Sequence, residues 1–168
     1  GNFDCGVAFD GDGDRCLAVT PSGRVVDGDQ IMYFCLRYLP YLQGAEGLAA
    51  TVMSNLGVEQ ALARAGQRLI RAQVGDRYVL EAMKQHGLRL GGEQSGHLIF
   101  RDHQVTGDGI LTALQLLSAL RLSGQSLDSL LDQVPLCPQT LLNVPVAPQH
   151  KHSWQENPRI QDTIRRCE

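Results

Sequence analysis

The sequence lacks a basic excess and any long apolar run. Its formal net charge is -3, and the Lys and Arg residues are scattered along the chain. A nucleic-acid partner is therefore not expected. The most apolar stretch, residues 110–122, is interrupted by polar residues. It is also shorter than the roughly 20 residues that cross a bilayer, so no membrane segment is expected.

The sequence also lacks a C-x-x-C pair and a secretory signal. Its cysteines form an odd, widely spaced set: Cys5, Cys16, Cys35, Cys137 and Cys167. Such spacing favours reduced thiols over a disulfide framework. Residues 1–4 have neither the basic start nor the apolar core of a signal peptide, and they resemble the middle of a protein. Together these features predict a cytoplasmic location.

What is present is the composition of a folded chain, with 43% hydrophobic and 20% charged residues. Apolar periodicity and turn residues predict strands at 5–9, 16–20, 25–26, 48–53, 67–72, 88–90 and 97–100. They predict helices at 28–40, 57–65, 76–85, 108–122 and 126–131. The long 108–122 helix is expected to bury Ala113, Leu117 and Leu120 on one face. The alternation of strand and helix predicts an α/β fold, a layered mixed sheet covered by helices.

The loop Asp10-Gly11-Asp12-Gly13-Asp14-Arg15 follows the first predicted strand. Its three carboxylates are separated only by glycines, which permit a tightly curved backbone that points them at one centre. Like charges this close repel unless a cation neutralises them, and all-oxygen ligation suits a hard cation such as Mg²⁺. A solvated Asp/Gly turn is the simpler alternative.

The sequence of this loop matches other known loop motifs less well. An EF-hand needs Gly sixth and Glu twelfth, where this chain has Arg15 and Pro21. A dinucleotide-binding G-x-G-x-x-G would need Gly at Cys16. The Asp-x-Asp start resembles a haloacid-dehalogenase-type phosphatase, but Asp14 stands where that family has Thr or Val.

The charges of the loop limit what it can do alone. Three carboxylates, one divalent metal and the Arg15 guanidinium sum to zero. Coordination of a phosphate would therefore have to come from the metal itself, and other cations would have to lie outside the loop.

Two further motifs carry polar groups that suit a sugar phosphate. In Gly91-Gly92-Glu93-Gln94-Ser95-Gly96-His97, Glu93 can accept from two sugar hydroxyls, Ser95 can donate and accept, and His97 can exchange a proton near neutral pH. A plain hairpin turn is the alternative. Val74-Gly75-Asp76-Arg77-Tyr78 lies at a strand-to-helix junction, where free N–H groups favour anions. Arg77 is the better phosphate candidate there, and Asp76 is expected to be a helix N-cap.

Taken in order, 10–15, 74–79 and 92–97 resemble the three motifs of the α-D-phosphohexomutase superfamily. The Val-Gly-Asp-Arg-Tyr-Val form is similar to the branch that acts on glucosamine phosphates rather than mannose phosphates. The resemblance implies a four-domain enzyme, with residues 1–24 ending domain two, 25–136 forming domain three and 137–168 beginning domain four. Domains one and four, which carry the phosphoserine and the main phosphate clamp, would be the missing partners.

The resemblance also implies roles for individual residues. Asp10, Asp12 and Asp14 would hold Mg²⁺, with Arg15 beside the phosphoryl group and His97 as a catalytic or auxiliary group. Glu93, Ser95, Gly75, Asp76 and Arg77 would bind the sugar phosphate. The implied reaction interconverts glucosamine 6-phosphate and glucosamine 1-phosphate through a phosphoserine and a bisphosphate. Because this chain lacks the phosphoserine, no turnover is expected from it alone. The alternatives are a small Mg²⁺-dependent phosphatase and a non-catalytic sugar-phosphate binding module.

Overall fold

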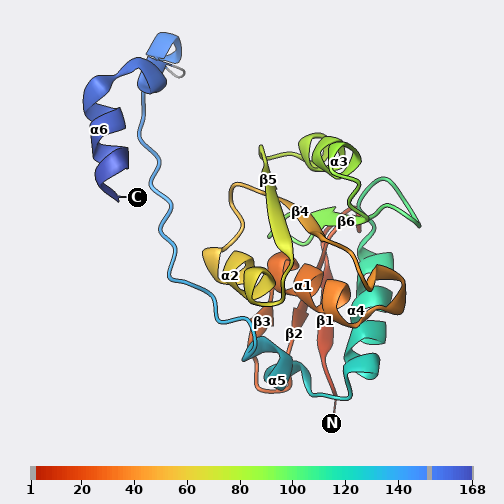
Figure 1. The fold of residues 1–168 in the computed structure, drawn as a ribbon. Helices are drawn as coiled ribbons and strands as arrows, with labels where there is room; N and C mark the ends of the chain where they lie inside the picture. The colour runs from red at the N-terminus through yellow and green to blue at the C-terminus, as the bar shows by residue number, and fades with distance from the viewer. Residues whose placement is uncertain (1–2, 151–152, 168) are drawn as a thin grey trace. The chain divides into compact units, whose positions relative to one another are not determined.

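The computed structural model of the chain describes residues 3–150 and 153–167. It divides into two compact units, Gly1–Cys137 and Pro138–Glu168 (Figure 1). The first unit contains a three-stranded sheet and a four-stranded sheet. All the predicted motifs lie in this first unit.

The three-stranded sheet is antiparallel and is built from β1 (Gly6–Phe9), β2 (Cys16–Val19) and β3 (Val25–Val26). Its inner face is buried and includes Cys16, Ala18 and Val26, whereas its outer face is apolar and exposed at Leu17, Val19 and Val25. The strands predicted at 5–9, 16–20 and 25–26 are confirmed. The loop that carries the three aspartates connects β1 to β2.

The four-stranded sheet is mixed, with the strand order β5 (Arg68–Ala72), β4 (Gly47–Thr51), β6 (Leu90–Gly92) and β7 (Leu98–Phe100). Strand β4 runs parallel to β5 and β6, and β6 pairs antiparallel with β7. The strand predicted at 88–90 begins later than expected. Leu88 instead closes the end of the preceding helix, where its N–H donates to Met83 O at 2.8 Å.

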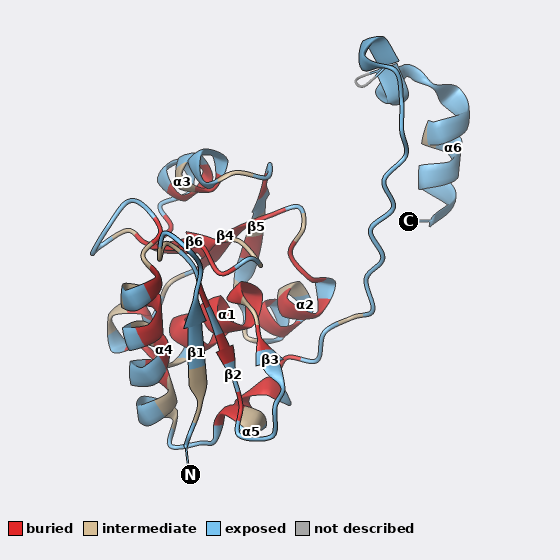
Figure 2. Ribbon diagram, turned by 180° about the vertical axis from the view of Figure 1, so that it is seen from behind, coloured by how far each residue is buried: buried red, intermediate tan, exposed pale blue. Residues whose placement is uncertain are grey.

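Helices cover both faces of this sheet, which confirms the predicted fold class. Helices α1 (Gly28–Tyr38) and α2 (Leu56–Arg64) pack on one face, and α3 (Asp76–Gln85) packs on the other. The period of two along β4 explains the layering, because Leu48 and Ala50 join the core with α1 while Ala49 joins the core with α3. Figure 2 shows α1, β4 and β6 in the colour of buried residues.

Helices α4 (Gly109–Ser123) and α5 (Leu127–Leu131) complete the first unit, and both predicted helices are confirmed. Helix α4 packs on α1 through Ala113, Leu116 and Ala119. The predicted core face is wrong at Leu117, which is 42% exposed. The buried stripe of α4 instead runs through Thr112, Leu116 and Ala119, positions that recur at helical spacing on a face next to Leu117. Gly124 ends α4 in the left-handed conformation, with φ of 65°.

The remaining elements are short. A 3-10 turn, η1 (Pro40–Leu42), follows α1, and the second unit contains η2 (Pro148–His150), η3 (Ser153–Glu156) and α6 (Pro158–Cys167). Trp154 is 45% exposed within this second unit. The cysteines are free, as predicted. Among the described residues, no helix has the length and apolarity needed to cross a membrane.

Candidate functional site

The site lies where three parallel strands end. Because β4, β5 and β6 are parallel, their carboxyl ends meet at one edge of the sheet, where α/β proteins place their ligands. The loops that leave this edge are 52–55, 73–75 and 93–97. Two of the three motifs are therefore neighbours for topological reasons.

The 93–97 loop is anchored to the start of α1. The N–H of Gly28 donates to Gln94 O at 3.0 Å, and Gln94 Nε2 donates to Asp27 Oδ2 at 3.1 Å. The other Asp27 oxygen caps α1 by accepting from Gln30 N–H at 3.1 Å. Burial raises the pKa of the Asp27 carboxyl, although these donors oppose the rise. A Cβ on Gly28 would lie 2.1 Å from Glu93 O, so only glycine allows this approach.

Glu93 connects the second and third motifs. Its Oε1 accepts from Gly75 N–H at 3.0 Å, and its Oε2 accepts from the Ser95 hydroxyl at 3.3 Å. The two side chains border a cavity of about 400 Å³ that is lined by Thr51, Met53, Val74, Glu93, Gln94 and Ser95. This cavity combines an apolar wall with a carboxylate, an amide and hydroxyls, the mixture that a sugar-sized ligand needs.

The aspartate loop reaches the same edge through backbone contacts. The N–H of Cys16 donates to Gly96 O at 3.1 Å, and the N–H of Gly109 donates to Gly13 O at 2.9 Å. A Cβ on Gly96 would lie 2.4 Å from Cys16 O, and a Cβ on Gly109 would lie 2.4 Å from Arg15 O. The loop is thus held between the 93–97 loop and the start of α4.

Asp10, Asp12 and Asp14 form a cluster whose candidate ligand oxygens all lie within 4.8 Å of one another. Burial first, then the neighbouring Asp10 and Asp12 carboxylates, raise the pKa of Asp14. Desolvation also acts on Asp10, but the Arg15 backbone N–H and side chain hold the pKa of Asp10 below its usual value. Among the residues that the structure describes, the buried Oδ1 atom of Asp14 finds no hydrogen-bond partner. An all-oxygen set with an unsatisfied buried oxygen fits a hard divalent cation.

Arg15 lies beside this cluster rather than away from it. Its backbone N–H donates to Asp10 Oδ1 at 3.2 Å, and its Nε lies 3.5 Å from Asp10 Oδ2 and 3.7 Å from Asp14 Oδ1. The side chain is 48% exposed, so its guanidinium remains accessible to an anion in solvent.

His97 is buried behind the aspartate loop, with 8% of its surface exposed. Its Nε2 accepts from Gly107 N–H at 2.7 Å, and its Nδ1 lies 3.5 Å from Asp14 Oδ2. The third motif therefore contacts the first through its last residue and the second through Glu93.

Asp76 and Arg77 are exposed at the start of α3. The prediction that Asp76 caps this helix is wrong, because Gly75 occupies the N-cap position and offers no side chain. Asp76 Oδ1 instead accepts from Arg77 N–H at 2.6 Å. The Arg77 guanidinium stacks on the Tyr78 ring, 5.2 Å from its centroid. The predicted junction is present, and Arg77 is accessible to a ligand.

Sequence reasoning missed several residues that hold the site together: Asp27, Thr51, Met53, Gln94 and Gly107. The spacing of Asp27 and Gln30 matches a capping box and could have been found. Asp27 Oδ2 accepts from Gln94, and the Gly107 N–H donates to His97. No local sequence pattern indicates contacts between residues this far apart in the chain.

Comparisons with known proteins agree on one family. The family described as Phosphoglucomutase/phosphomannomutase, alpha/beta/alpha domain III, matches residues 27–136. The chain is 52% identical over 167 residues to the phosphoglucosamine mutase of Pelotomaculum thermopropionicum, covering 98% of this chain and 37% of that protein. It is 50% identical over 169 residues to that of Limosilactobacillus reuteri, covering 99% of this chain and 37% of that protein. The chain thus spans well under half the length of these curated relatives.

Solved structures share the fold. A phosphoglucomutase/phosphomannomutase family protein from Burkholderia thailandensis superposes with a TM-score of 0.64 at 28% identity, covering 78% of this chain and 29% of that one. An Aspergillus fumigatus N-acetylphosphoglucosamine mutase, crystallised with GlcNAc-6P and magnesium, superposes with a TM-score of 0.66 at 19% identity. It covers 84% of this chain and 35% of that one. The second likeness is one of fold alone.

Proposed function

Because this chain belongs to the phosphoglucomutase/phosphomannomutase family, we propose that it forms one wall of the active site of a phosphoglucosamine mutase. That enzyme would interconvert glucosamine 6-phosphate and glucosamine 1-phosphate, in the supply of amino sugar for cell-wall precursors. The observation that carries the proposal is the hydrogen-bonded convergence of the three motifs. Glu93 joins Gly75 and Ser95, and His97 reaches Asp14.

The chain's own residues would bind and orient the substrate. Glu93 and Ser95 border the cavity and can each exchange hydrogen bonds with sugar hydroxyls. Gly75, Asp76 and Arg77 lie at the neighbouring start of α3, where a phosphate is favoured by the helix N-terminus and by the guanidinium. Such binding fixes the distance between reacting groups, which supplies much of the rate in phosphoryl transfer.

Asp10, Asp12 and Asp14 would hold Mg²⁺, and Arg15 would lie beside the phosphoryl group. When bound, the metal would neutralise charge on that group. The remaining machinery, a phosphoserine and a second phosphate clamp, would come from other domains of the parent enzyme. We propose the domain division that the sequence predicted, in which residues 1–24, 25–136 and 137–168 belong to successive domains. The outer face of β2 and β3 is apolar and exposed, which supports the proposal that another part of the parent enzyme covers this sheet.

A calorimetric titration tests the metal site first. Mg²⁺ added to the chain is expected to give a binding signal that Asp12→Asn loses. Asp132→Asn is the matched control. Asp132 is exposed at the C-terminal end of α5, where it pairs with Arg24 at 2.8 Å and not with a residue of the aspartate loop. Equal Mg²⁺ binding by the chain and Asp12→Asn would remove the metal assignment.

Two activity assays then separate the candidate functions. With Mg²⁺ present, glucosamine 6-phosphate is expected to bind to the chain and to bind less tightly to Glu93→Gln, without conversion. Hydrolysis of p-nitrophenyl phosphate would favour a phosphatase instead. Formation of glucosamine 1-phosphate by the purified chain would contradict the expectation that the chain is inactive alone.

A further inference from the structure

The cavity beside Glu93 has two walls that come from different parts of the chain. Thr51 and Met53 line it from the end of β4 and the loop that follows. Glu93, Gln94 and Ser95 line it from the loop between β6 and β7. A ligand that touches both walls binds well only if the two loops keep a fixed spacing.

The first turn of α1, with its N-cap Asp27, holds the loop between β6 and β7. Asp27 Oδ1 accepts from Gln30 N–H at 3.1 Å, so Oδ2 is available to another donor. Gln94 Nε2 is that donor at 3.1 Å, and Gly28 N–H donates to Gln94 O at 3.0 Å. The side chain and the backbone of Gln94 are therefore both bound to the same turn, although Asp27 does not line the cavity.

The same turn holds the opposite wall through Asp29. Asp29 is fully buried, and its Oδ2 accepts from Asn55 N–H at 2.7 Å. A buried carboxyl group is costly unless hydrogen bonds satisfy it, so this contact favours one position of the loop after β4. That loop is closed by Ser54 N–H, which donates to Thr51 O at 3.1 Å. Asp29 thus fixes the turn that brings Met53 to the cavity.

The first turn of α1 is itself fixed on the core. Residues 28–36 of α1 are all buried, and α1 packs on α4, β4 and β6. One helix therefore carries both Asp27 and Asp29. Groups built on a packed helix hold their positions more precisely than groups on loops. The spacing of the two cavity walls is consequently set from a single turn.

We propose that Asp27 and Asp29 are positioning residues, which hold the two walls of the sugar cavity at the spacing that binds the substrate. Asp27 acts through Gln94 and Asp29 acts through Asn55, and neither carboxyl group contacts the sugar phosphate. The inference rests on the proposed function, because it takes this cavity as the site of the sugar. The attachment of each loop to the turn can be measured without any ligand.

Substitutions at Asp27 separate its capping role from its hold on the loop. Serine is a good N-cap and should still accept from Gln30 N–H, but it is too short to reach Gln94. Asp27→Ser is therefore expected to keep the urea midpoint of wild type. By calorimetry with Mg²⁺ present, it should bind glucosamine 6-phosphate about 10-fold more weakly. Asp27→Asn should bind within a few-fold of wild type, because the Gln94 amide can turn and accept from the new amide. The opposite order of the two variants would overturn the role of Asp27.

A double-mutant cycle tests whether Asp27 acts through Gln94. Gln94→Ala should weaken binding by itself, because Gln94 lines the cavity. In that background, Asp27→Ser should cause little further loss, since the contact through which it acts is already gone. Losses that add would overturn this coupling. Tyr38→Phe is the control and should bind like wild type, because Tyr38 donates to Gln133 Oε1 at 3.1 Å from the other end of α1.

Asp29 is tested in the same way at the other wall. Asp29→Asn keeps an acceptor for Asn55 N–H and should bind glucosamine 6-phosphate within a few-fold of wild type. Asp29→Leu has no acceptor and should bind about 10-fold more weakly. Equal affinity of the two variants would overturn the role of Asp29. If Asp29→Leu does not fold, hydrogen exchange at the Asn55 amide decides instead. Protection in wild type and Asp29→Asn supports the role, and rapid exchange in wild type overturns it.

Hydrogen exchange without ligand separates this inference from the proposed function. The Gly28 amide, which donates to Gln94 O, should exchange faster in Asp27→Ser than in Asp27→Asn. Equal exchange in the two variants would overturn the positioning role even if the sugar phosphate binds. If wild type binds no glucosamine 6-phosphate while the exchange rates differ as expected, the assignment of the cavity to a sugar phosphate fails, whereas the attachment of the loop to α1 stands.

Discussion

Asn55 joins the start of α2 to the end of the first unit, so its loss should destabilise that unit. It is 3% exposed and lies between β4 and α2. Its Oδ1 accepts from Gly57 N–H at 2.9 Å and from Cys137 N–H at 2.8 Å, while its Nδ2 donates to Cys137 O at 2.9 Å. One side chain thus caps α2 and fastens the end of the unit to it.

The expected effect of Asn55→Ala follows from these bonds. Loss of the N-cap costs about 0.5–2 kcal/mol. Leaving the Cys137 backbone groups without partners costs roughly 1–3 kcal/mol more. We therefore expect the free energy of unfolding to fall by about 1.5–5 kcal/mol.

Asn55→Ser divides this loss into its two parts. Serine is a good N-cap and should still accept from Gly57 N–H, but it is too short to reach Cys137. About half of the loss should return. Urea unfolding measures both variants, with the midpoint shifted and the slope unchanged. Hydrogen exchange at the Cys137 amide should be faster in both. If both variants lie within about 0.5 kcal/mol of wild type, the attributed bonds contribute little and the reasoning is refuted.

Three further outcomes are expected. Burial raises the pKa of the Asp29 carboxyl in the folded state. Asp29 therefore contributes to stability below the ordinary carboxyl pKa of about 3.9, and this contribution is lost as pH rises through the higher pKa of the folded state. The difference in unfolding free energy between wild type and Asp29→Asn, measured in urea at several pH values, should therefore shrink as pH rises. Exposed Cys167 should react with N-ethylmaleimide before buried Cys16, whose pKa is raised to about 11, and before Cys35, as mass spectrometry of the native chain can check. Gly124→Ala should lower the unfolding free energy by about 1 kcal/mol in urea, because a Cβ there has free space but an unfavourable φ.

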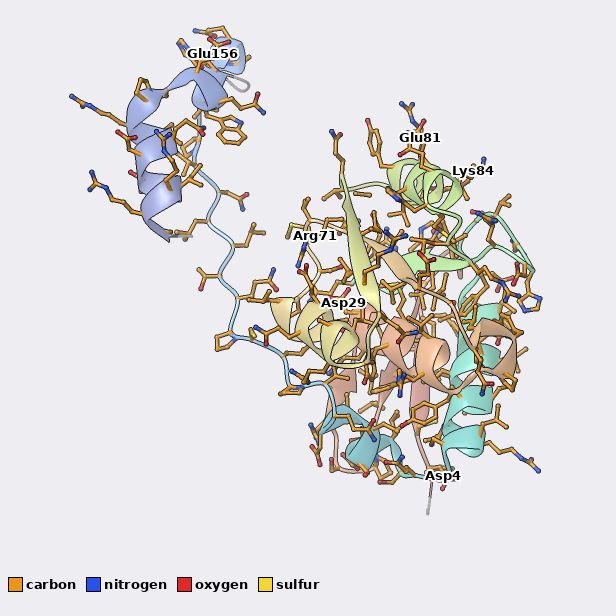
Figure 3. All side chains as sticks on the ribbon, in the orientation of Figure 1. Asp4, Asp29, Arg71, Glu81, Lys84 and Glu156 are labelled. Carbon is orange, nitrogen blue, oxygen red and sulfur yellow. The ribbon has the colours of Figure 1, made fainter. Side chains whose placement is uncertain are left out.

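The region around Asp29 shows how charge is arranged beside the site. Asp29 is fully buried in the first turn of α1 and accepts from Asn55 N–H at 2.7 Å. Arg71 donates to Ser54 O at 3.0 Å and pairs with Glu59 at 2.6 Å. Figure 3 labels Asp29 and Arg71 near α2 and β5, and Glu81 and Lys84 on the outer side of α3. The loop that follows β4 is thus held from both sides at Ser54 and Asn55, directly after Met53, which lines the cavity.

The elements were predictable where local patterns agree with tertiary packing. The capping residues Asp108 and Gly124 locate α4 from sequence alone. The end of β6 was misplaced because Gly91 and Gly92 have the letters of a turn, whereas the strand continues to Gly92. In the sheet, a Cβ on Gly91 would lie 2.7 Å from Met83 Sδ and 2.9 Å from Ala49 O, so the strand needs glycine for close packing. Only the positions of the neighbouring helix and strand, which the local sequence does not show, reveal that glycine is required at this position.

The site divides in the same way between residues that carry chemistry and residues that position it. The carboxylates, the hydroxyl and the imidazole of the site can be recognised in short sequence motifs, because their chemistry requires particular residue types. Their positions depend on Asp27 and Gly107, which stand in no motif assigned to a ligand, and on Gln94, whose side chain donates to Asp27. Each acts through a bond to a backbone group or a polar atom that is distant in sequence. Substitutions at Asp27 and Gly107 should therefore change metal and sugar binding without removing any group that borders the cavity or belongs to the aspartate cluster.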